Sequence, residues 1–290
     1  MTVEHGIERV AVLGLGTMGA GIAVLVARSG FDVIALEATA ERIEHGLAHA
    51  RGFLDESVRR GKLTEQDRDE VLARLRGTTD VDDLAGVDLV IEAVVENRDV
   101  KRELLVRVAA VVGEDAAIVT NTSALSVTDL AAAIPGPERC AGLHFFNPAP
   151  LMKIIEVVRA LQTDAALVAR LEEFVESLGK TAVVVKDRPG FLVNYLLMPY
   201  LNDVIQELDD GLATAEDLDV AIKLGLGHRL GPVELLDMIG LDVHAHATES
   251  AYEATRDVRF TPPPLLRQMV AAGRLGDKSG RGLRTAGDGR

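Results

Sequence analysis

The chain has 290 residues, of which 48% are hydrophobic, so it can bury a large core in one or two domains. Its 31 basic and 45 acidic side chains give a formal net charge of -14. This charge repels nucleic acids and anionic membranes, and so excludes them as partners. A single cysteine, Cys140, excludes an internal disulfide, and we expect no secretory leader, so the composition favours a reducing cytoplasm.

The first apolar stretch lacks charge from Arg9 to Arg28, but its glycines divide it into a strand, a turn and a helix instead of a membrane span. The turn consists of Gly14, Leu15, Gly16, Thr17, Met18 and Gly19. Such glycines permit a tight turn, a close approach of pyrophosphate to the backbone, and close packing of helix on strand. Glu37 follows about 20 residues later, where an acid accepts hydrogen bonds from the adenosine ribose and disfavours NADP. This context predicts an NAD site in preference to a glycine turn that only packs.

Strand-like runs of branched residues alternate with helical stretches in the first part of the chain. They cover residues 10–13, 32–36, 89–93 and 117–120. This alternation predicts βαβ units and a parallel sheet, as in an α/β, doubly wound, Rossmann-type domain. The charged stretch from about 40 to 75 is expected to form an exposed helical hairpin.

The pattern changes after a charged stretch with Pro and Gly at 186–190, which we take as the domain boundary. Apolar residues then recur at helical spacing over 191–211, and Thr214 begins another helix with a capping-box pattern. We therefore expect an NAD-binding domain over 1–187 and a C-terminal all-α domain for substrate binding and dimerisation over 188–290.

A dehydrogenase that oxidises an alcohol needs a base for the hydroxyl proton, and neutral histidine can serve near pH 7. Among the seven histidines, His144 ends a predicted strand, and the next strand-like run ends at Glu156. A turn between the strands can place this carboxylate beside the ring, where it would orient the ring and stabilise the imidazolium. A structural histidine and a solvent-facing Glu156 are the alternatives. His244 and His246 are only two residues apart, so no metal site is expected.

The whole sequence resembles the short-chain 3-hydroxyacyl-CoA dehydrogenases, including the bacterial 3-hydroxybutyryl-CoA dehydrogenases. The motifs that carry the resemblance are the glycine turn, Ile91–Asn97, Asn121–Ser123, His144–Pro148 with Met152, Lys153 and Glu156, Pro189–Phe191 with Asn194, and Gly231-Pro232. So many separated motifs in the same order are specific. The resemblance implies an NAD-dependent oxidoreductase of fatty acid metabolism, acting on acyl thioesters as a homodimer.

The resemblance also implies individual roles. It makes His144 the catalytic base, Glu156 its partner, and Ser123 and Asn194 polar contacts for the substrate hydroxyl and acyl carbonyl. NAD contacts are implied for the glycine turn, Glu37, Glu96, Lys101, Ser123 and Asn147. Structural alternatives are a helix cap at Ser123, a turn at Asn194 and a surface ion pair of Glu96 with Lys101.

The hairpin is less basic than in the family, which leaves Arg51, Arg59, Arg60 and Lys62 as candidates for the CoA phosphates. This departure opens a second interpretation, in which the same chemistry acts on a 3-hydroxyacyl unit carried by an acyl carrier protein, as in polyketide extender-unit biosynthesis. Two others are a dehydrogenase of free hydroxyacids and a crystallin-like NAD-binding protein without catalysis.

Overall fold

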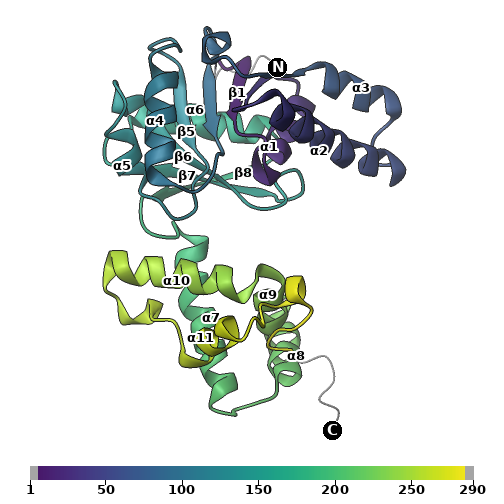
Figure 1. The fold of residues 1–290 in the computed structure, drawn as a ribbon, viewed down its shortest axis with the longest axis vertical. Helices are drawn as coiled ribbons and strands as arrows, with labels where there is room; N and C mark the ends of the chain where they lie inside the picture. Colours follow the sequence, from purple (N-terminus) through teal and green to yellow (C-terminus); the bar gives the residue numbers. More distant parts are fainter. Residues whose placement is uncertain (1–5, 285–290) are drawn as a thin grey trace. The chain divides into compact units, whose positions relative to one another are not determined.

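The computed structural model describes residues 6–284 and divides the chain into two compact units, Met1–Asp187 and Arg188–Arg290. Figure 1 shows the elements of both units.

The first unit is built on one sheet, whose strands in the described part of the chain have the order β3-β2-β1-β4-β5-β6-β7-β8. The strands are β1 (Arg9–Leu13), β2 (Asp32–Leu36), β3 (Leu75–Thr78), β4 (Leu89–Glu92), β5 (Ala117–Thr120), β6 (Cys140–Phe145), β7 (Ile154–Arg159) and β8 (Thr181–Lys186). Neighbouring strands pair parallel, except that β6 and β7 pair antiparallel. The central strands are buried along most of their length, which explains their nearly continuous runs of branched residues.

Helices flank this sheet (Figure 1). They are α1 (Thr17–Arg28), α2 (Ala40–Arg59), α3 (Glu65–Ala73), α4 (Arg98–Ala109), α5 (Val127–Ala131) and α6 (Ala165–Ser177), with 3-10 turns η1 (Val81–Leu84) and η2 (Pro137–Arg139). Local side chains fix several helix starts, since Thr64 forms a capping box with Asp67 and the Asn97 side chain accepts two backbone N–H groups of α4. Such caps contribute about 1 kcal/mol each.

The hydrophobic core of this unit joins β1 and β4 to α1 and α6. Val12, Ile22, Ile91 and Phe174 are among its fully buried members. Each such side chain contributes roughly 1.5–3 kcal/mol by leaving water. The four predicted strands, the helical hairpin and the strand-turn-helix division of the first apolar stretch are confirmed.

The second unit is helical, and the predicted all-α architecture is confirmed. Its elements are α7 (Val193–Asp209), α8 (Ala215–Leu226), α9 (Pro232–Ile239), α10 (Leu241–Thr255), η3 (Val258–Phe260), α11 (Pro264–Ala271) and η4 (Asp277–Ser279). Its core contains Leu201, Ile205, Leu236 and Leu266. Thr214 accepts a hydrogen bond from the backbone N–H of Asp217 at the start of α8, as its sequence pattern predicts.

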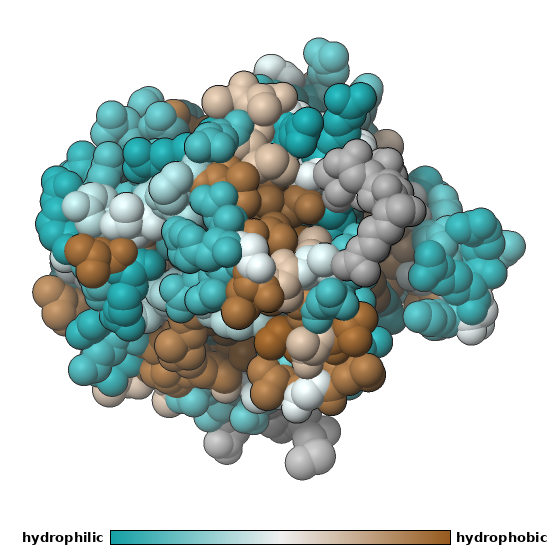
Figure 2. All heavy atoms as spheres, turned by 90° about the horizontal axis from the view of Figure 1, so that it is seen from below, coloured by the Kyte–Doolittle hydropathy of each residue, from teal (hydrophilic) through white to brown (hydrophobic). Residues whose placement is uncertain are grey.

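Part of the surface of the second unit is apolar. Leu224 and Leu226 near the end of α8 are 82% and 65% exposed, and Leu212 before α8 is 69% exposed. Figure 2 shows hydrophobic side chains in adjoining groups on the face viewed there. Among residues 6–284, no helix is both long enough and apolar enough to cross a bilayer.

Candidate active site

A cavity of about 930 Å³ opens where β1, β2 and β4 end. Its lining includes the turn Gly14–Gly16, Glu37 after β2, and Val94 after β4, opposite the α4 side chains Leu104 and Arg107. The strand order changes direction between β1 and β4, and open parallel sheets bind ligands in the crevice at such a point.

The glycine turn shapes the floor of this cavity. Gly14 has a φ of +90°, which side chains rarely adopt, and a Cβ on Gly19 would lie 1.8 Å from the Gly14 carbonyl oxygen, so α1 packs directly on the turn. A Cβ on Gly16 would meet nothing within 4 Å, which leaves open space beside the N-terminus of α1. The first N–H groups of this helix, from Thr17 and Met18, can therefore receive a pyrophosphate.

Glu37 is held in a defined position at the cavity wall. Its Oε1 accepts a hydrogen bond from the Leu15 N–H at 2.7 Å, and its Oε2 accepts one from the Ala38 N–H at 3.0 Å. Arg42 lies 4.0 Å from the same carboxylate. Each carboxylate oxygen keeps acceptor capacity for a ribose hydroxyl, while its charge repels a 2′-phosphate. The turn and Glu37 thus fit NAD.

His144 and Glu156 are register partners on β6 and β7, and Nδ1 of the ring lies 2.7 Å from Oε2 of the carboxylate. An ionised carboxylate only accepts, so Nδ1 carries the proton and Nε2 is left as the acceptor. Glu156 is fully buried and His144 is 5% exposed. The predicted adjacency is confirmed, and a solvent-facing Glu156 is wrong. The Phe146 ring, 4.7 Å from the imidazole by ring centroids, packs beside it.

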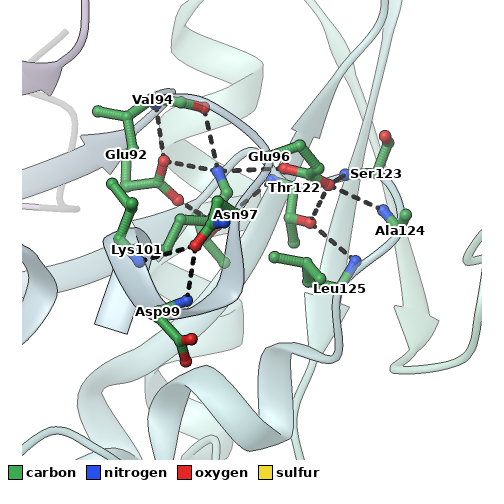
Figure 3. A network of polar contacts seen from close by, with 12 residues as sticks. Glu92, Val94, Glu96, Asn97, Asp99, Lys101, Thr122, Ser123, Ala124 and Leu125 are labelled. Carbon is green, nitrogen blue, oxygen red and sulfur yellow. Dashed lines mark hydrogen bonds and ion pairs between the residues drawn. The ribbon is translucent and has the colours of Figure 1, made fainter. Parts of the chain in front are cut away.

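A network of charges, buried at Glu92 and Lys101, lies between the end of β4 and the start of α4 (Figure 3). Nζ of Lys101 lies 2.6 Å from Oε1 of Glu92 and 3.2 Å from Oε2 of Glu96. Lys101 is 1% exposed and Glu92 is fully buried. Glu96 and Lys101 therefore form the ion pair that the structural alternative names, but only Glu96 lies at the surface, and the ammonium is buried.

Glu96 connects the network to the loop after β5. Its Oε1 accepts hydrogen bonds from the Ser123 N–H at 3.0 Å, the Ala124 N–H at 3.1 Å and the Thr122 hydroxyl (Figure 3). Burial raises the pKa of Glu96, but Lys101 and these hydrogen bonds outweigh it and hold the pKa below its ordinary value of 4.5. Glu96 is therefore ionised at neutral pH.

The Ser123 hydroxyl has no hydrogen-bond partner among residues 6–284, and Ser123 is exposed. A helix cap at this position is wrong, because Ser126 caps α5. The loop is also tied to β6, since Asn121 Oδ1 accepts the Phe145 N–H at 2.9 Å, one residue beyond His144. Ser123 thus offers a hydroxyl on a loop that both Glu96 and the His144 strand hold in place.

Asn147 and Asn194 are the remaining residues for which we predict contacts with the cofactor or the substrate. Asn147 is exposed in the turn after β6, where its peptide bond to Pro148 is cis. Asn194 is the second residue of α7, in the second unit. A tight turn precedes it, in which a Cβ on Gly190 would lie 2.9 Å from the Tyr195 nitrogen.

The basic side chains of the hairpin are partly engaged. Arg59 and Arg60 both pair with Glu56 on the same helix, and the hydrogen bond from Arg59 leads the causes that lower the pKa of Glu56. Arg51 and Arg59 are exposed. Any contact of these two arginines with the CoA phosphates would therefore be made on the exposed surface of the hairpin.

Sequence reasoning did not single out three residues that hold the site in place, which are Glu92, Thr120 and Asn121. Glu92 was visible as a lone acid that ends an apolar strand, in the fragment Leu89–Glu92. Such a buried charge requires charged or hydrogen-bonding partners, and this requirement is the signal that could have found Glu92 and its partner Thr120.

Two family models cover nearly the whole chain: "3-hydroxyacyl-CoA dehydrogenase, NAD binding domain" matches residues 9–188, and "3-hydroxyacyl-CoA dehydrogenase, C-terminal domain" matches residues 190–286. A 3-hydroxybutyryl-CoA dehydrogenase of Mycobacterium tuberculosis is 45% identical over 98% of this chain and 100% of the relative. One from Bradyrhizobium diazoefficiens is 42% identical over 96% of this chain and 94% of the relative. The crystal structure of (S)-3-hydroxybutyryl-CoA dehydrogenase from Ralstonia eutropha has a TM-score of 0.93 and 41% identity, covering 98% of this chain and all of that one.

Proposed function

This chain belongs to the 3-hydroxyacyl-CoA dehydrogenase family, and we propose that it interconverts short-chain 3-hydroxyacyl-CoA and 3-oxoacyl-CoA, with 3-hydroxybutyryl-CoA as substrate. The observation that carries the proposal is the buried pair of His144 and Glu156, which leaves Nε2 as the basic atom. This pair lies on the sheet whose other strands end at the NAD cavity.

NAD, when bound, supplies the hydride acceptor for C3 of the substrate. The glycine turn would hold its pyrophosphate and Glu37 its adenosine ribose. Glu96 and Asn147 are our candidates for polar contacts nearer the reacting end. Lys101 remains a predicted contact, and its buried ammonium would act there through Glu96.

The proton is handled by the dyad. In oxidation, Nε2 of His144 accepts the proton of the C3 hydroxyl as the hydride leaves, and Glu156 stabilises the resulting imidazolium. In reduction, the imidazolium returns the proton to the carbonyl oxygen. Burial of both side chains limits exchange of this proton with water. The unpartnered Ser123 hydroxyl is assigned to the substrate hydroxyl, and Asn194 to the acyl thioester.

The test is NADH oxidation by the purified protein with acetoacetyl-CoA, acetoacetyl-acyl carrier protein and free acetoacetate in parallel. We expect turnover with acetoacetyl-CoA that is lost in His144→Gln. Turnover only with the carrier-protein thioester would replace the CoA substrate, and turnover only with the free acid would overturn the thioester class. A protein that binds NADH but reduces none of the three would be a non-catalytic relative.

The homodimer is also part of the proposal. Leu212, Leu224 and Leu226 are exposed apolar side chains of the helical unit, and burial of such side chains by a second copy would stabilise a dimer. Light scattering of the purified chain is the direct test. We also propose a cytoplasmic location, which fits a sequence whose single cysteine, Cys140, leaves no internal disulfide to form.

A further inference from the structure

The ion pair of Glu92 and Lys101 is unusual because it is fully buried in a sheet domain and touches no solvent. Besides Lys101, Glu92 Oε1 accepts the Val94 N–H at 2.7 Å, and Oε2 accepts the Thr120 hydroxyl at 2.6 Å. The carboxylate is thus well satisfied. Even so, a buried pair costs so much desolvation that a hydrophobic pair of similar size is often as stable. Stability alone is a weak reason for it.

The buried ion pair is also connected to the loop after β5. Lys101 Nζ contacts two carboxylates, the buried Glu92 and the half-exposed Glu96. Glu96 in turn holds the backbone N–H groups of Ser123 and Ala124. The chain of contacts therefore runs from the sheet interior to the loop that presents the Ser123 hydroxyl (Figure 3).

We propose that Glu92 is a positioning residue for the Ser123 loop, acting through Lys101 and Glu96. Glu92 holds the ammonium 2.6 Å from its own Oε1, where Nζ lies 3.2 Å from Oε2 of Glu96, while Oε1 of Glu96 accepts hydrogen bonds from the loop amides. Without the Glu92 charge, Glu96 becomes the one carboxylate within reach of Lys101 among residues 6–284, and the ammonium draws it away from the loop. The consequence for turnover rests on the proposed function of Ser123; the consequence for the loop does not.

Glu92→Gln tests the loop directly, in the protein without substrate. We expect hydrogen exchange of the Ser123 and Ala124 amides to accelerate by about tenfold or more, with exchange in α6 unchanged. Thr120→Val is the control, because it removes a hydrogen bond to the same carboxylate, together with the acceptor of the Thr122 N–H, but keeps the ion pair and the Glu96 contacts to Ser123 and Ala124. This control should leave exchange at both amides near the original rate. Unchanged exchange in Glu92→Gln would overturn the proposal.

Activity separates positioning from a general loss of structure. At saturating NADH, so that the cofactor contact proposed for Glu96 does not limit the rate, we expect Glu92→Gln to lower kcat/KM for acetoacetyl-CoA by roughly tenfold. In a Ser123→Ala background we expect a loss of less than about twofold, because both changes then act on one hydroxyl. An equal loss in both backgrounds would overturn positioning through Ser123. Faster exchange with full activity would instead contradict the proposed role of Ser123 and leave the positioning of the loop intact.

Glu92→Gln leaves a buried ammonium and can fail to fold. Glu92→Gln with Lys101→Met removes both charges together, so the buried pair stays neutral. This double variant has no ammonium to draw Glu96 away from the loop, so we expect exchange at Ser123 and Ala124 to stay near the original rate. Exchange about tenfold faster in the double variant would overturn positioning through Lys101. If the double variant also fails to fold, Glu92 has a structural role alone and the proposal is overturned.

Discussion

His144 and Glu156 meet across the antiparallel pair of β6 and β7, with Nδ1 2.7 Å from Oε2. Side chains directly opposite in a ladder lie on the same face, so the register itself brings base and carboxylate together. A shift of one residue would place them on opposite faces. The pairing of the two strands therefore fixes the position of His144 relative to Glu156.

Replacing the base should remove the chemistry and leave cofactor binding intact. We expect His144→Gln to lower kcat by about 10²–10⁴-fold, because a positioned general base contributes that much. The glutamine amide can still donate to Glu156, so the fold should persist. Stopped-flow reduction of acetoacetyl-CoA measures the first effect and NADH fluorescence titration the second. Near-normal turnover would refute the assignment of His144.

The partner carboxylate should matter less, and only through the ring. Glu156→Gln keeps a hydrogen bond to Nδ1 but removes the charge that stabilises the imidazolium, so we expect kcat to fall roughly 10–100-fold. In a His144→Gln background the same change should cost less than about twofold, because the two residues act as a unit. Additive losses in the double variant would show that Glu156 acts independently of His144.

Glu37 should set the choice between NADH and NADPH. Glu37→Ala removes the charge opposed to a 2′-phosphate and frees Arg42, 4.0 Å from that carboxylate, to pair with one. We expect the ratio of kcat/KM for NADH over NADPH to fall by roughly 10–10³-fold. Glu41→Ala, at another position on the cavity lining, is the matched control and should keep the ratio. If Glu37→Ala kept the ratio of kcat/KM for NADH over NADPH, the adenosine ribose would not bind at Glu37.

Local patterns explain why much of this site could be predicted. The glycine turn and Glu37 are read from neighbours within one βαβ unit, and the turn between two strands suffices to bring Glu156 to His144. The burial of Lys101 could not be read in this way. It lies on a charged helix segment, where lysine ordinarily faces water, yet its side chain is 1% exposed and its Nζ lies 2.6 Å from Glu92 at the end of β4.

The helical unit contains its own buried histidine, which should make its stability depend on pH. His244 is 3% exposed and its Nε2 lies 3.0 Å from Asn202 Oδ1. The Asn202 amide nitrogen donates to Thr248 Oγ1, so Oδ1 faces the ring, and Nε2 carries the proton of a neutral imidazole. Burial lowers the pKa of His244 from 6.5 to about 4.

Because this pKa is lower in the folded than in the unfolded chain, the unfolded chain binds the extra proton as the pH falls below 6.5. The contribution of His244 to stability is thus present above the unfolded pKa and is lost progressively down to about pH 4. The loss should amount to roughly 2–3 kcal/mol of unfolding free energy between about pH 7 and about pH 4.5. Urea unfolding at both pH values measures it.

The comparison that isolates this histidine is with His244→Gln, which cannot titrate, and with His246→Gln, which removes an exposed histidine of the same helix. The first variant should be less stable at pH 7 but lose less stability on acidification, since its unfolding takes up one proton fewer. The second should follow the original protein at both pH values. If the stability of His244→Gln fell with pH as steeply as that of the original chain, the acid sensitivity would belong to other groups and His244 would be protonated without cost.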